Sequence, residues 1–163
     1  MLRTQLEDRR ESASEFPVPK AQAPANKKFK IKVRFDYRGV PRPSRFIFGG
    51  KKSREVAEEL RQRQAAMWRN VPLQGVRIEE TDFFELYSVY DEVEDDILFY
   101  APMEITAIVD SLEDCVQFIC REEFKRIEIL EPAQASLSSR ELERLFFKLS
   151  ETMQQRLREY ELK

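Results

Sequence analysis

The residues best suited to binding chemistry are ten cations that fall between positions 27 and 52, with aromatic side chains such as Phe35, Tyr37, Phe46 and Phe48 among them. Cations bind phosphates and aromatic rings stack on bases, so this pattern is typical of a surface for single-stranded RNA. The same cations would suit an acidic protein. The candidate residues for binding either partner are Lys30, Lys32, Arg34, Arg38, Arg42, Arg45, Lys51 and Lys52.

The first of these cations alternate with apolar residues from position 29 to position 37. Because successive side chains of a strand point to opposite faces, this run predicts a half-buried strand with a basic second face. Its aromatic residues, such as Phe35, fall on the apolar face and not among the cations. RNA-recognition domains carry their aromatics on the open face, and no run of the kind that marks them occurs in this chain. We therefore rank nucleic acid below protein as the expected partner.

The charges of the chain divide into two halves of opposite sign. Residues 1–75 contain 18 Lys and Arg against 8 Asp and Glu, and residues 76–163 contain 10 against 22. The first half thus carries +10 and the second half −12. Such a split indicates either an anionic partner for the basic half or neutralisation of one half by the other. We favour neutralisation within the fold.

The composition argues against most enzyme chemistry. The chain has no histidine, which removes the commonest general base and metal ligand. Cys115 and Cys120 are five apart in a predicted helix, so they point to different sides and cannot bridge each other. The run Gly49–Ser53 lacks the spacing of a phosphate-binding loop, and the acidic runs at 79–82 and 91–96 resemble solvated turns. We expect no catalytic residue, metal or cofactor, and rank a metal-dependent or nucleotide-using enzyme third.

The elements that position these residues follow the order strand, helix, strand, strand, helix, strand. We expect strands at 29–37, 75–91, 97–109 and 126–130, and helices at 52–69 and 111–123. A further short strand at 45–48 would close a hairpin. This order predicts an α+β fold of the ferredoxin-like (split βαβ) type, with two helices on one face of an antiparallel sheet and strands 29–37 and 97–109 at its centre. Ser53 is expected to cap its helix, and Pro102 predicts a bulge, a break or an edge position in its strand.

Segments on either side complete the predicted organisation. Residues 1–26 are expected to be a disordered tail, residues 27–132 the ferredoxin-like domain, and residues 138–163 an amphipathic helix that starts at a capping box. That helix would pack on its own sheet, or pair with another copy of the chain, since its spacing only approaches a heptad. Its expected interface residues are Leu142, Phe146, Leu149, Met153, Leu157 and Tyr160.

These features favour a non-enzymatic protein-binding, assembly or regulatory role, with another protein as partner. The contacts would be made by the basic face, the tail and the last helix, and a homodimer through that helix is an alternative. An RNA- or DNA-binding domain that uses residues 27–52 is the second reading. No apolar run approaches the roughly 20 residues of a membrane span, and the N-terminus lacks the apolar core of a secretory signal. We therefore expect a cytoplasmic protein.

Overall fold

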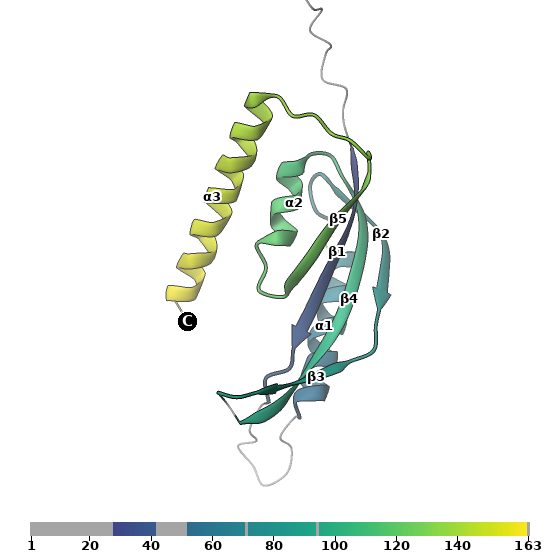
Figure 1. Ribbon diagram of the computed structural model, residues 1–163, viewed down its shortest axis with the longest axis vertical. Coiled ribbons are helices and arrows are strands. Elements are labelled where there is room, and N and C mark those ends of the chain that lie inside the picture. Colours follow the sequence, from purple (N-terminus) through teal and green to yellow (C-terminus); the bar gives the residue numbers. More distant parts are fainter. Residues whose placement is uncertain (1–27, 42–51, 71, 94, 163) are drawn as a thin grey trace, which may run out of the picture.

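A computed structural model of the protein describes residues 28–41, 52–70, 72–93 and 95–162. These residues form an α+β fold in which a five-stranded antiparallel sheet is combined with three helices (Figure 1). The predicted tail at 1–26 and the predicted hairpin strand at 45–48 lie outside the described residues.

The sheet is organised around two long neighbouring strands, β1 (Phe29–Arg38) and β4 (Asp96–Val109). β5 (Phe124–Glu131) pairs with the other side of β1. β2 (Val76–Phe83) and β3 (Tyr87–Asp91) both pair with the outer side of β4, β2 along its second half and β3 along its first. The order is therefore β2-β4-β1-β5, with every pairing antiparallel. The two strands predicted for the centre are the central pair.

Pro102 lies in the middle of β4, where it is fully buried and pairs with Asp36 of β1. Its carbonyl oxygen accepts the backbone N–H of Phe84 at 3.2 Å, so this side of Pro102 faces the segment that separates β2 from β3. Proline has no N–H to give to a neighbouring strand. β4 runs through Pro102 without a bulge or a break and lies inside the sheet, so none of the three predicted alternatives holds for this strand. The interruption lies in the neighbouring segment, between β2 and β3.

One face of the sheet is covered by α1 (Ser53–Asn70) and α2 (Leu112–Ile119). The apolar side chains of β1 point to this face and are almost completely buried. The ring of Trp68 from α1 stacks between Phe35 of β1, with ring centres 5.9 Å apart, and Phe118 of α2, at 5.0 Å. Burying each such side chain stabilises the fold by about 1.5–3 kcal/mol. This aromatic cluster joins both helices to the central strand.

Ser53 has a different role from the predicted cap. Its buried hydroxyl donates to the carbonyl oxygen of Gly39 at 2.6 Å and accepts the backbone N–H of Phe99 at 2.7 Å. It therefore ties the start of α1 to the ends of β1 and β4. Gly39 is needed for this approach, since a Cβ there would lie 1.9 Å from the carbonyl oxygen of Ser53.

The long helix α3 (Ser139–Glu161) begins at the predicted capping box of Ser138 and Glu141. In Figure 1 it stands beside α2, on the side of α2 that is remote from the sheet. Arg144 binds Glu113 of α2 at 3.0 Å, and the hydroxyl of Tyr160 donates to Glu122 at 3.1 Å. This helix was expected to pack on the sheet, but it packs on α2 instead. A short linker leads from β5 to α3, and α2 already covers β5.

No helix of the described residues combines the length and the apolarity needed to cross a membrane.

Candidate interaction surfaces

The predicted basic residues that the structure describes are Lys30, Lys32, Arg34, Arg38 and Lys52. Arg42, Arg45 and Lys51 lie outside the described residues. The three cations Lys30, Lys32 and Arg34 are half-buried on the face of β1 that points away from α1 and α2. Arg38 is exposed at the end of the same strand, and Lys52 is exposed immediately before α1.

Acidic side chains form ion pairs with most of the cations on β1. Lys30 lies 3.2 Å from Glu79 of β2, and Arg38 lies 2.9 Å from Asp91 of β3. Lys32 forms no ion pair with the described residues, but the strand register places it directly opposite Glu128 of β5.

The same pattern continues on the neighbouring strands, where Arg126 of β5 binds Glu104 of β4 at 2.9 Å. Apart from Asp36, the acids on this face come from the acidic second half of the chain. The surface that the sequence presents as basic is therefore one of mixed charge. This arrangement agrees with neutralisation of one half of the chain by the other.

Asp36 is the centre of a small polar network on this face. Its side chain is only 5% exposed, and it accepts hydrogen bonds from Nε of Arg34 at 2.9 Å and from the hydroxyl of Tyr87 at 2.7 Å. The hydrogen bond to Asp36 raises the pKa of Arg34 above its ordinary value. Burial, helped by the hydrogen bond to Asp36, raises the pKa of Tyr87 to about 12.

Tyr87 also stacks on Tyr100 of β4, with ring centres 5.3 Å apart. We did not predict this network from the sequence. Its one available signal was that Asp36 interrupts the row of cations on β1. The position of Tyr87 depends on the pairing of β3 with β4, which no local pattern reveals.

The apolar stripe of α3 is only partly covered. Half-buried residues such as Leu145 and Leu149 lie on the side of the helix that faces α2. Successive residues of a helix are turned by roughly 100° about its axis. The other side chains of the stripe, such as Phe146 directly after Leu145, therefore lie at the side of the contact with α2 and not within it. These side chains are 40–61% exposed, and they are Leu142, Phe146, Met153, Leu157 and Tyr160. The apolar arc of α3 is therefore wider than the surface that α2 offers it.

A second exposed apolar area lies on the hairpin formed by β3 and the start of β4, at one end of the sheet (Figure 1). Val93 at its turn is 90% exposed, and Tyr90 and Ile97 are exposed beside it. The turn is acidic, and the hydroxyl of Tyr90 donates to Asp95. From the sequence we predicted only an extended segment with a solvated turn here.

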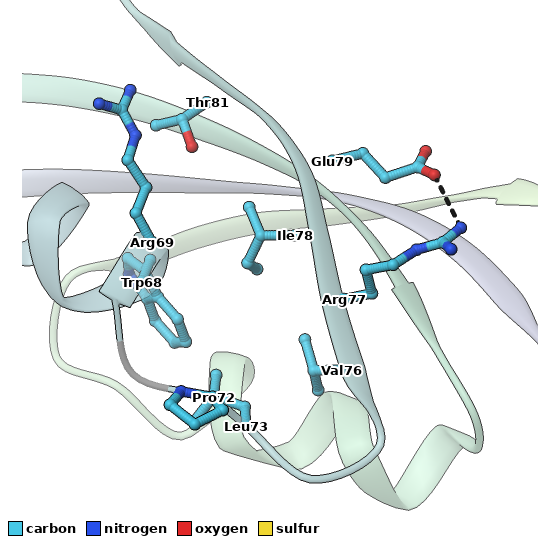
Figure 2. Close-up of a pocket in the computed structure, with 9 residues that line it drawn as sticks. All are labelled: Trp68, Arg69, Pro72, Leu73, Val76, Arg77, Ile78, Glu79 and Thr81. Atoms are coloured by element: carbon cyan, nitrogen blue, oxygen red, sulfur yellow. Dashed lines mark hydrogen bonds and ion pairs between the residues drawn. The ribbon is translucent and has the colours of Figure 1, made fainter.

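A cavity of about 410 Å³ lies between the end of α1 and the edge strand β2. Figure 2 shows Trp68, Val76 and Ile78 around its apolar interior, while Arg69 and the ion pair of Arg77 with Glu79 stand at its rim. The lining also includes the carboxylate of Glu79 and the hydroxyl of Thr81, so the cavity offers apolar contact, charge and polar groups to a bound molecule.

The described residues contain no group of three acidic or cysteine side chains that could hold a metal ion. Cys115 is buried, and burial raises the pKa of its thiol to about 12, while Cys120 is half-buried and its pKa is also raised. A raised pKa lowers the fraction of reactive thiolate. Neither thiol is therefore activated for nucleophilic chemistry.

Comparison of the chain with protein-family models found no match, and comparison with curated protein sequences found none either.

Proposed function

We propose that this chain is a non-enzymatic protein-binding module with an assembly or regulatory role, and that α3 carries its binding surface. The observation that supports this is the uncovered apolar stripe of α3. It runs from Leu142 to Tyr160, which corresponds to about 27 Å at the rise of an α-helix. A contiguous exposed apolar surface of this kind is typical of protein–protein interfaces.

Burial would stabilise a complex through this stripe. Each large apolar side chain that leaves water contributes about 1.5–3 kcal/mol before the costs of association are subtracted. Phe146 and Leu157, which are 60% and 61% exposed, have the most surface left to bury. A helix that lays its apolar face on a groove or on another helix is a common mode of recognition.

The mixed-charge face of β1 has a secondary role in this proposal. A nucleic acid would have to compete with Glu79 and Asp91 for cations that these acids already hold. For this reason we rank an RNA- or DNA-binding domain below the protein-binding module. Lys32 is the cation on this strand best placed to meet an anionic partner.

The ferredoxin-like arrangement belongs to the same proposal. The strand order β2-β4-β1-β5 supports it, with α1 after β1 and α2 after β4. In this reading β2 and β3 are two parts of one strand that is interrupted opposite Pro102. A cytoplasmic location is also part of the proposal, and cell fractionation tests it.

Capture from a native extract tests the proposed function. The full chain is compared with a Phe146→Gln, Leu157→Gln variant, and Val93→Gln is the matched control because it removes an exposed apolar side chain far from α3. We expect the wild type and the control to retain the same protein, and the α3 variant to lose it. Treating the extract with nuclease should change nothing.

Two results would contradict the proposal. In one, the α3 variant captures the same protein as the wild type. In the other, the captured material disappears after nuclease treatment or after Lys30, Lys32 and Arg34 are replaced by Glu, which would favour nucleic acid on the face of β1.

A further inference from the structure

We propose that the cavity between the end of α1 and the edge strand β2 binds a small amphipathic anion, a molecule with an apolar ring-containing body and one carboxylate or similar acidic group. This inference goes beyond the proposed function and does not depend on it. It follows from the side chains that line the cavity, from its size and from the charges at its rim.

The apolar walls of the cavity come from three segments of the chain (Figure 2). Trp68 belongs to the last turn of α1, Leu73 to the connection that follows, and Val76 and Ile78 to β2. The register of β2 with β4 places Val76 and Ile78 on the face of the sheet that α1 covers. All of these side chains therefore face the space between the helix and the sheet.

The walls keep some apolar surface because β2 is the edge of the sheet. No strand of the described residues pairs with its outer side, and α1 packs mainly on β4 and β1. Leu73, Val76 and Ile78 are consequently only half-buried, while Trp68 is 4% exposed and closes the inner side. An apolar body placed here would remove this surface from water, which favours binding.

The size of the cavity limits the ligand. Its volume is about 410 Å³, and sites for small molecules usually measure about 300–1,000 Å³. In Figure 2 the space has Trp68 on one side and Val76 and Ile78 on the other. We therefore expect a ligand with one or two rings and not a large cofactor.

The charges around the cavity leave one cation in excess. Arg77 lies 3.2 Å from Glu79, and Glu79 also lies 3.2 Å from Lys30. Arg69 stands at the rim, exposed, and forms no ion pair or hydrogen bond with any described residue. Part of its charge balances the negative end of the α1 dipole, which amounts to about half a charge. The remainder favours an anion at this place.

Two donors at the rim suit an acidic group. The guanidinium of Arg69 offers paired N–H donors that match the two oxygens of a carboxylate. Thr81 of β2 lines the same cavity on the same face as Ile78, and its hydroxyl can donate a further hydrogen bond. In Figure 2 both stand at the opposite end of the cavity from Leu73. The ligand would therefore lie with its apolar body toward Val76 and its acidic group toward Arg69.

Binding of 2-naphthoate to the full chain tests the proposal, with 2-naphthalenemethanol as the neutral control that has the same two rings. The chain is labelled with nitrogen-15 and titrated in NMR, where Trp68, the single tryptophan, gives one indole N–H signal. We expect 2-naphthoate to shift this signal and the amide signals of Val76 and Ile78 until they saturate. The neutral compound should bind about tenfold more weakly, because it lacks the charge that Arg69 would meet.

Two variants identify the cation. Arg69→Gln removes the guanidinium from the rim and should raise the dissociation constant of 2-naphthoate about tenfold. Arg63→Gln is the matched control, because Arg63 is also exposed on α1 but does not line the cavity. It should change the constant by less than about twofold. Since both arginines are exposed, we expect both variants to fold as the wild type does.

An indole signal of Trp68 that stays unchanged up to about 5 mM 2-naphthoate would overturn the proposal. Equal binding of the neutral compound would do so too, as would an unchanged dissociation constant in Arg69→Gln. Shifts confined to α3 would show binding to its apolar stripe and would count against the cavity. Protein binding through α3 is judged separately, by the capture experiment with the Phe146→Gln, Leu157→Gln variant.

Discussion

Replacing Arg34 by Met tests whether the face of β1 is held together by its own charges. Asp36 is almost buried, and its carboxylate has two side-chain donors, Nε of Arg34 and the hydroxyl of Tyr87. Methionine keeps much of the length and apolar contact of Arg34 but removes the guanidinium. The carboxylate of Asp36 would then have the hydroxyl of Tyr87 as its one remaining side-chain donor among the described residues.

The cost follows from the exposure of the two partners. Removing one partner of a fully buried ion pair costs about 3–5 kcal/mol. Arg34 is 32% exposed, and solvent screening reduces the value, so we expect a loss of about 2 kcal/mol in the free energy of unfolding. For a chain of this size the melting temperature should fall by about 4–8 °C. Lys32→Met, on the same face of the same strand, should change the free energy by less than about 0.5 kcal/mol.

Urea unfolding is the assay, with the fluorescence of Trp68, the single tryptophan of the chain, as the probe of the core. The variants Arg34→Met and Asp36→Asn, together with the double variant, complete a thermodynamic cycle. We expect a coupling energy of about 1 kcal/mol or more between the two residues. A loss for Arg34→Met no larger than that for Lys32→Met, with a coupling energy near zero, would show that the Arg34–Asp36 pair does not stabilise this face.

Three further predictions concern the core, the pH dependence and the thiols. Phe118→Ala should lower the free energy of unfolding by about 3–5 kcal/mol in urea titrations, since it removes a fully buried ring stacked on Trp68; a loss below about 1 kcal/mol would contradict the described core. The folded state raises the pKa of Tyr87 from 10.0 to about 12, so it favours the protonated phenol. This contribution to stability is fully present below pH 10 and is lost as the pH rises toward 12; unfolding measured across that window should depend less on pH in Tyr87→Phe, and an unchanged dependence would count against the shift. Alkylation of the folded chain at pH 8, followed by peptide mass analysis, should modify Cys120 well before Cys115, because Cys115 is the more deeply buried thiol; equal rates would show that Cys115 is accessible.

Local patterns predicted the elements that are defined by their own sequence. The alternation of residues 29–37 identified β1 and its buried face, and Ser138 with Glu141 identified the start of α3. In both cases the signal lies within a few neighbouring residues, and side-chain periodicity alone carries it. The central position of β1 and β4 was predicted from the order of the elements, which matches the split βαβ pattern, and the clean apolar faces of these two strands agreed with it.

The partners of the charges could not be predicted in this way. The acid that pairs with Lys30 or Arg38 depends on the register between strands. The register shifts within the pairing of β1 with β5 and within the pairing of β2 with β4. A shift of one residue moves every side chain to the other face. The cations therefore suggested an open basic surface, whereas the fold places Glu79 and Asp91 beside them.

The position of α3 in the fold also could not be predicted from the sequence. Its stripe showed that an apolar face must be covered but not what covers it. The half-buried Leu149 and the exposed Phe146 lie on the same predicted stripe, and only the placement of α2 separates them. Because α2 covers the sheet, α3 packs on α2 instead, and α2 covers only part of the apolar face of α3.

Photo-crosslinking can distinguish whether α3 or the face of β1 contacts the partner. A photo-reactive amino acid is placed at the position of Phe146 in one version of the full chain and at the position of Lys32 in another, and both are irradiated in native extract. We expect crosslinked protein, whether a second copy of the chain or another protein, from the position of Phe146 and little from that of Lys32. Crosslinks from the position of Lys32 alone, to protein or to nucleic acid, would contradict this expectation.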